Sequence, residues 1–147
     1  MRIEVRDAPF DAGALIASCG AGDPRVGAVA GFTGVVRGDG ALSAMEIEHY
    51  PGMTEAQLDA FAREAVERFG LIDVAVVHRV GRMEVGETIM AVACAAPHRG
   101  DAFAAAEYLM DWLKSRAPFW KKEHRAEGES WVAARDSDEA ALGRWGR

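Results

Sequence analysis

The sequence has no apolar run of about 18 residues, the length that a membrane-spanning helix needs. Its first residues, MRIEVRDAPF, also lack the basic and then apolar order of a signal peptide, so we expect a cytoplasmic protein. Cysteine is scarce, because Cys19 and Cys94 are the only two and cannot make a disulfide framework. Cys94 lies in the apolar run MAVACAA, where a thiol usually packs as a small hydrophobic side chain rather than acting as a nucleophile.

Positive charge is in deficit. The 17 lysine and arginine residues face 23 aspartate and glutamate residues, which gives a net charge of -6. A general binder of nucleic acid or of anionic membranes needs the opposite balance, so both classes are disfavoured. A local basic pocket for a small anion is still allowed.

Several motifs that carry chemistry are missing. No GxGxxG or GxxxxGK[ST] element follows a predicted strand, and no GxSxG elbow is present. The cysteines do not form CxxC, and no two histidines have HxxxH or HExxH spacing, so we expect no metal site. The four histidines are His49, His78, His98 and His124.

The chain of 147 residues is predicted to form one α+β domain, with a mixed or antiparallel sheet built from hairpins and packed against two main helices. Alternating and apolar runs predict strands at residues 2–6, 26–36, 44–50, 72–80, 88–96, 119–125 and 130–134. Helical spacing predicts helices at residues 11–19, 54–69, 101–115 and 137–145. Strands 26–36 and 44–50 are expected to form a hairpin, and the tail after about residue 136 is the least defined part.

Details of the two main helices follow from the same patterns. Thr54 and Gln57 fit a capping box at the start of the first, and Gly70 ends it. In the second, helical spacing places Phe103, Ala106, Met110 and Leu113 on one apolar face.

Two places in the sequence suit an anion. His98 and Arg99 directly precede the helix at 101–115, whose first N–H groups are free and whose dipole favours negative charge. Arg37 follows a strand of small residues and lies beside the flexible GDG segment. From spacing alone, a solvated turn is the simpler explanation of the first place, and Arg37 by itself does not establish a site.

Two lysines in the segment LKSRAPFWKKEH pose a similar choice. Lys114 lies in the last helical turn, where a cation is favourable, and Lys121 alternates with Glu123 and Arg125 on one strand face. Pro118 prevents a continuous helix, so only tertiary structure can bring the two lysines together. The functional alternative is one pocket in which they carry out acid–base or nucleophilic chemistry.

Six stretches, taken in order, resemble one family. They are FTGVVR, EHYPGMTE, HRVGRMEVGE, APHRGDAF, EYLMDWLKSRAPFWKKE and GESWVAAR. Together they are similar to the catalytic (large) subunit of molybdopterin synthase, over about residues 1 to 136. The resemblance implies a sulfurtransferase of molybdenum cofactor biosynthesis, which converts cyclic pyranopterin monophosphate into molybdopterin by installing two dithiolene sulfurs.

The resemblance also implies where the sulfur comes from. In this family a small ubiquitin-like subunit carries it as a C-terminal Gly-Gly thiocarboxylate, and its tail enters a pocket of the large subunit. No cofactor of the large subunit itself is implied. The large subunit forms a homodimer with one carrier at each far end, a heterotetramer, and each active site takes residues from both protomers.

Site residues follow from the resemblance position by position. Lys114 and Lys121 match the active-site lysines, which are expected to act in proton transfer and in charge or phosphate binding. The remaining matches are expected to contact the substrate, and they are Val35, Val36, Arg37, His98, Arg99, Lys122, Glu123 and Arg135.

Two other functions fit the residues less well. A non-catalytic adaptor would bind the Gly-Gly tail in the same groove, but it would not need the lysines or the anion site. A Schiff-base enzyme would use Lys121 as its amine, but this lysine lies among charged neighbours rather than in an apolar run.

Overall fold

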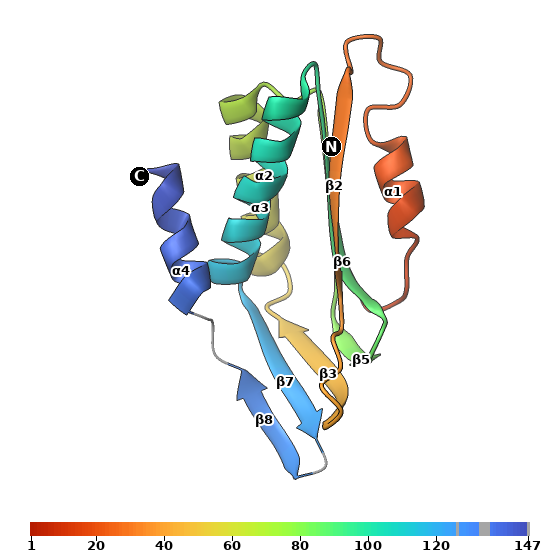
Figure 1. The fold of residues 1–147 in the computed structure, drawn as a ribbon, viewed down its shortest axis with the longest axis vertical. Coiled ribbons are helices and arrows are strands. Elements are labelled where there is room, and N and C mark those ends of the chain that lie inside the picture. The colour runs from red at the N-terminus through yellow and green to blue at the C-terminus, as the bar shows by residue number, and fades with distance from the viewer. Residues whose placement is uncertain (126, 133–135, 147) are drawn as a thin grey trace.

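The computed structural model describes residues 1–125, 127–132 and 136–146. Its elements form two four-stranded sheets and a set of helices (Figure 1). In chain order they are β1 Arg2–Arg6, α1 Ala12–Ser18, β2 Ala28–Val35, β3 Leu42–His49, α2 Met53–Phe69, β4 Asp73–Arg79, β5 Gly81–Glu84, β6 Thr88–Ala96, α3 Arg99–Ser115, β7 Phe119–Arg125, β8 Gly128–Val132, α4 Asp136–Leu142 and a 3-10 turn, η1, Gly143–Trp145. The predicted α+β class is confirmed.

The first sheet has the strand order β1-β4-β6-β2. β1 runs parallel to β4, and the other pairs are antiparallel. Figure 1 shows α1 on one side of this sheet and α2 and α3 on the other. Because both faces are covered, the central strands β4 and β6 are buried almost throughout, which explains their nearly continuous apolar sequences.

The second sheet is antiparallel throughout, with the order β5-β3-β7-β8. The predicted hairpin between strands 26–36 and 44–50 is therefore wrong, since β2 pairs with β6 and β3 pairs with β5 and β7. The segment between them is longer than a tight hairpin turn. Backbone hydrogen bonds tie Val36 to the turn before β6, from its N–H to the oxygen of Glu87 at 2.9 Å and from the N–H of Gly86 to its oxygen at 2.8 Å, so the chain leaves the first sheet at this point.

Helix α2 begins differently from its predicted capping box. The N-cap is Gly52, whose N–H donates to the carboxylate of Glu55 at 3.0 Å, so Glu55 takes the place expected for Gln57. The hydroxyl of Thr54 accepts from the N–H of Tyr50 at 2.9 Å and donates to the carbonyl of Pro118 at 3.1 Å. Thr54 thereby fastens the start of α2 to the turn that leads into β7. The expected stop at Gly70 is confirmed, with a left-handed backbone there.

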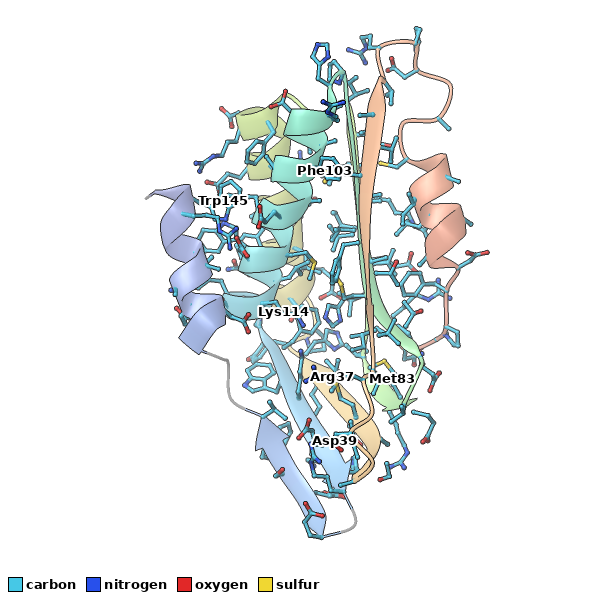
Figure 2. All side chains as sticks on the ribbon, viewed as in Figure 1. Arg37, Asp39, Met83, Phe103, Lys114 and Trp145 are labelled. Carbon is cyan, nitrogen blue, oxygen red and sulfur yellow. The ribbon has the colours of Figure 1, made fainter. Side chains whose placement is uncertain are left out.

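Helix α3 packs against the first sheet through its small and aliphatic side chains. Its buried residues are Ala102, Ala105, Ala106, Tyr108, Leu109 and Leu113. Phe103, which we placed on one apolar face with Ala106 and Leu113, is instead 67% exposed and projects from the helix (Figure 2). It follows Ala102 by one position, about 100° around the helix, and so lies on the flank of the buried stripe.

Candidate active site

The turn between α3 and β7 brings the two lysines of LKSRAPFWKKEH to one region. The carbonyl of Trp112 accepts from the N–H groups of Arg116 and Ala117, at 2.8 and 3.1 Å, and this closes the helix just after Lys114. Pro118 then interrupts the helical pattern, and its carbonyl is held by Thr54. The chain reverses into β7, whose third residue is Lys121.

The charges of both lysines act on the same buried ring, that of His78 at the end of β4. The imidazole stacks on Phe119, with 3.8 Å between ring centroids and 16° between ring planes. Lys121 lies two residues after Phe119 and therefore on the same face of β7. Burial, together with the positive charges of Lys121 and Lys114, lowers the pKa of His78 to about 3. The charges at the end of α3 and on β7 thus both act on His78. Tertiary structure, rather than a continuous helix through Pro118, is responsible for this.

Two residues of this cluster were not among the sequence-based candidates. His78 is 5% exposed, and the charge of His49, at the end of β3, also acts on it. His49 is paired in register with Phe119, on the strand that carries Lys121. The signal in the sequence was a titratable side chain ending the apolar run DVAVVH, although it could not show what lies beside that side chain.

Lys122 and Glu123 follow Lys121 in the sequence, but their side chains lie on opposite faces of β7. Lys122 points to the other face of β7, because strand neighbours alternate, and its ammonium lies 4.7 Å from the ring centroid of Trp131 and 3.6 Å from the carboxylate of Glu129. Glu123 shares the face of Lys121 and accepts from Arg125 at 3.1 Å. In the single chain, the lysine cluster therefore contains Lys121 without Lys122.

The chain leaves the first sheet after Val35 and Val36, and Arg37 is the next residue. Val35 is 49% exposed and Val36 is buried, while Arg37 itself is exposed. Figure 2 shows Arg37 below Lys114 and above Asp39 in this view.

The loop after Arg37 is fastened by Asp39. Its carboxylate accepts from the N–H groups of Ala41 and Leu42 and pairs with Arg125 at 2.7 Å. The Arg125 hydrogen bond, together with these two backbone hydrogen bonds, lowers the pKa of Asp39 to about 2. The loop is thus tied to the far end of β7.

His98 and Arg99 lie at the opposite end of α3 from Lys114. His98 is the N-cap, with an extended backbone and no side-chain cap hydrogen bond, and both side chains are exposed. At 1.5 Å per helical residue, Arg99 and Lys114 are about 22 Å apart along the axis. One chain therefore does not unite the predicted anion site with the lysines. Arg135 lies outside the described residues.

Neither cysteine is suited to nucleophilic chemistry. Cys19 and Cys94 are free and buried, with exposures of 4% and 0%. Burial raises the pKa of each thiol to about 12, and at Cys19 the negative charge of Asp73 adds to the effect. Because the thiolate is the reactive form, the structure agrees with the packing role expected for Cys94.

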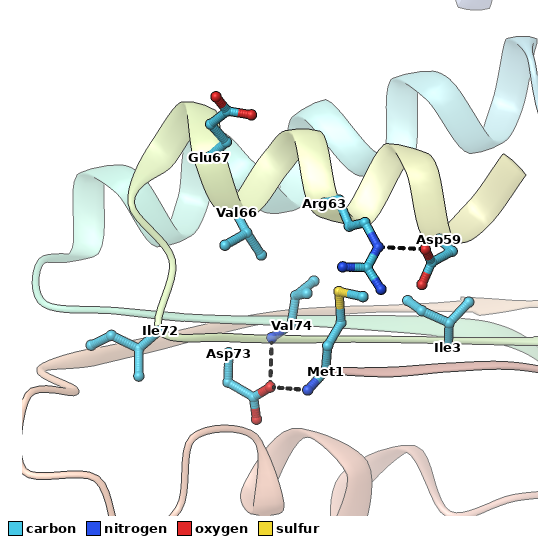
Figure 3. A pocket seen from close by; sticks show the side chains of 9 residues that line it. All are labelled: Met1, Ile3, Asp59, Arg63, Val66, Glu67, Ile72, Asp73 and Val74. Carbon is cyan, nitrogen blue, oxygen red and sulfur yellow. Dashed lines mark hydrogen bonds and ion pairs between the residues drawn. The ribbon is translucent and has the colours of Figure 1, made fainter. Parts of the chain in front are cut away.

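A cavity lies elsewhere in the fold, away from these residues. It measures about 680 Å³ and is located between α2 and the β1–β4 edge of the first sheet (Figure 3). Its charged groups are largely paired with one another, as in the ion pairs between Arg63 and Asp59 at 2.6 Å and between the Met1 amine and Asp73 at 3.1 Å. None of the predicted site residues lines it, so we do not assign the reaction to it.

Within residues 1–125, 127–132 and 136–146, no group of three or more histidine, cysteine, aspartate or glutamate side chains is arranged to hold a metal ion. In the same part of the chain, no helix is long and apolar enough to cross a membrane.

Comparison with known proteins gives consistent results. The family model described as "MoaE protein" matches residues 5–116. A relative from Cereibacter sphaeroides, named "Molybdopterin synthase catalytic subunit", is 59% identical over 146 residues, which cover 99% of this chain and 100% of the relative. A relative of the same name from Pseudomonas aeruginosa is 49% identical and covers 99% of each chain.

Solved structures agree. The "Molybdopterin biosynthesis MoaE protein" from Burkholderia ambifaria superposes with a TM-score of 0.86 at 52% identity and covers 99% of this chain and 98% of its own. A chain in a "Protein-protein complex of subunit 1 and 2 of Molybdopterin-converting factor" from Helicobacter pylori has the same fold, with a TM-score of 0.76 at 18% identity over 90% of each chain. From the family model and these relatives, we conclude that the chain belongs to the MoaE family, the family of the molybdopterin synthase catalytic subunit.

Proposed function

We propose that this chain is the sulfurtransferase subunit that converts cyclic pyranopterin monophosphate into molybdopterin, with Lys114 and Lys121 as its catalytic groups. One observation carries the proposal: Lys114 at the end of α3 and Lys121, the third residue of β7, both act by their charge on the same buried ring, that of His78. Two fixed cations suit a reaction that handles a phosphorylated substrate and a carboxylate-derived sulfur donor.

The sulfur comes from a partner. A small ubiquitin-like carrier brings it as a C-terminal Gly-Gly thiocarboxylate, and two such tails are used in sequence. Two observations support an outside source: both thiols of this chain are buried with raised pKa values, and the Helicobacter pylori protein with this fold is described in complex with a second subunit. In this proposal the subunit has no cofactor of its own.

The roles of the residues follow from their positions. Lys121 acts either in proton transfer or as the acceptor group at the terminal carbonyl of the carrier. Lys114 either stabilises developing negative charge or holds the substrate phosphate. Arg37, with Val35 and Val36, contacts the substrate from the end of β2. The other expected contacts are His98, Arg99, Lys122, Glu123 and Arg135.

A homodimer completes the site. Because Arg99 and Lys114 mark opposite ends of α3, two copies related by a two-fold axis with antiparallel α3 helices bring Arg99 of one copy to Lys114 of the other. The exposed Phe103 lies one helical turn after Arg99. Phe32, on the edge strand β2 of the first sheet, is 42% exposed. These apolar side chains are suited to the interface. With a carrier at each end, the assembly is a heterotetramer.

The reaction is expected in the cytoplasm. The two cysteines are unpaired, as is usual in a reducing compartment, and no described helix crosses a membrane.

Mixing two inactive variants tests the shared site. Lys121→Ala and Arg99→Ala are each expected to lose most product formation when assayed alone with thiocarboxylated carrier. When the two are unfolded together and refolded, half of the dimers are mixed and each has one intact site, so about a quarter of the wild-type turnover returns. A mixture as inactive as its components would contradict the shared site, and full activity of either variant alone would contradict its assigned role.

A further inference from the structure

His78 is a buried titratable side chain at the lysine cluster, and the roles assigned above do not use it. We propose that His78 is a positioning residue for the reaction, whose Nε2 atom accepts a hydrogen bond from the ammonium group of Lys121 and holds that group in place. The proposal concerns the protein's own contacts, and only its kinetic test rests on the proposed function.

The first support is the state of the imidazole ring. Its Nδ1 atom lies 2.8 Å from the backbone carbonyl oxygen of Arg79, and a carbonyl only accepts hydrogen bonds. Nδ1 must therefore carry the proton. In the neutral ring, Nε2 then has a free lone pair and can only accept.

The second support is the rigidity of the ring. Phe119 covers one face of it at 3.8 Å between centroids, and the side chain is 5% exposed. The Nδ1 hydrogen bond fixes rotation about the ring axis. An acceptor with a fixed direction can orient a flexible lysine side chain. A hydrogen bond of this kind is needed because holding the side chain in one geometry costs rotamer entropy.

The third support is the set of charged groups around the ring. Lys114 from α3, Lys121 from β7 and His49 from β3 all act electrostatically on it, with Lys121 as the strongest of the three. A protonated ring would be repelled by both lysines, whereas a neutral ring offers a lone pair to an ammonium group. The Arg79 guanidinium, which follows His78 on β4, is paired with Glu87 at 3.0 Å. The geometry thus favours a neutral acceptor that adds no charge to the cluster.

Nitrogen NMR of the histidine rings tests the contact directly. We expect His78 to show a protonated Nδ1 and an unprotonated Nε2 from about pH 6 to 8, well above its titration. Lys121→Met, which keeps the length of the stem, should shift the Nε2 resonance. Lys122→Met is the matched control, because that ammonium lies over Trp131 on the opposite face of β7. A proton on Nε2, or an Nε2 resonance that responds equally to both variants or to neither, would overturn the proposal.

Kinetics test the consequence for the reaction. His78→Gln can place an acceptor near the position of Nε2, whereas His78→Phe keeps the stacked ring and removes the acceptor. We expect His78→Phe to lower kcat at least about tenfold with little change in KM, and His78→Gln to stay within about threefold of wild type. If His78→Phe does not fold, His78→Asn replaces it, since its amide can still donate to the Arg79 carbonyl but does not reach the Nε2 position.

The outcomes separate this inference from the proposed function. Wild-type kcat in His78→Phe or His78→Asn, or equal losses in these variants and in His78→Gln, would overturn the positioning role. If the wild-type protein itself forms no product, the proposed function fails, while the NMR experiment still decides whether Nε2 accepts from Lys121.

Discussion

Acidification should destabilise the protein through His78. The pKa of this ring is lowered by burial to about 3, from its ordinary value of 6.5. Between these two values the unfolded chain binds a proton at His78 that the folded protein does not bind. Stability from this residue is therefore complete above about pH 6.5 and is lost as the pH falls toward 3.

The size of the effect follows from the two pKa values. Between pH 7 and pH 5, protonation of the unfolded chain at His78 should lower the free energy of unfolding by about 2 kcal/mol. Because the ring is 5% exposed, solvent screening does not reduce this value much. The variant His78→Gln cannot titrate and should lack this loss, whatever its stability at pH 7.

Urea denaturation followed by tryptophan fluorescence measures the difference. Wild type and His78→Gln are compared at pH 7 and pH 5 at one fixed protein concentration, because association also contributes to stability. The other histidines and the carboxylates are common to both proteins and cancel. If both proteins lose the same free energy between pH 7 and pH 5, His78 is not buried in its neutral form and the reasoning fails.

Three further changes test the site and its assembly. Lys121→Ala should abolish product formation while leaving the affinity for the carrier within about threefold by calorimetry, and a loss of carrier binding would assign it a different role. The double variant Cys19→Ala and Cys94→Ala should keep its turnover and lose about 2 kcal/mol of stability in urea, since both thiols only pack in the core; a loss of sulfur transfer by the folded variant would make a thiol part of the reaction. Phe103→Glu should leave the circular dichroism spectrum unchanged but shift the protein to monomers in light scattering, whereas an unchanged dimer would place the interface elsewhere.

Local patterns in the sequence predicted much of the fold. Helix α2, with its stop at Gly70, and the apolar strands β4 and β6 follow from residues close in the chain. The pairing of β2 was not predictable in the same way, because its alternation does not say which strand lies beside it. The loop after β2 resembles a hairpin turn, but hydrogen bonds from Val36 to the distant turn before β6 separate the two strands.

The candidate site, like the fold, was predictable only where it depends on residues close in the chain. The sequence located Lys114 at a helix end and Lys121 on a strand, and Pro118 required that any meeting be tertiary. It could not predict that the charges of both would act on His78, because this depends on how β4 lies against β7 across the two sheets, where His78 stacks on Phe119. Phe103 was misplaced because helical spacing defines a stripe only to within about one residue, or 100°.

Reconstitution of the reaction tests the central claim most directly. The purified chain is mixed with cyclic pyranopterin monophosphate and with a small carrier subunit that ends in either a thiocarboxylate or an ordinary carboxylate, and dithiolene product is measured. The account predicts product only with the thiocarboxylated carrier, and two carriers converted to the carboxylate for each molybdopterin formed. A folded, carrier-bound protein that forms no product would contradict the account and favour an adaptor that holds the carrier tail without chemistry.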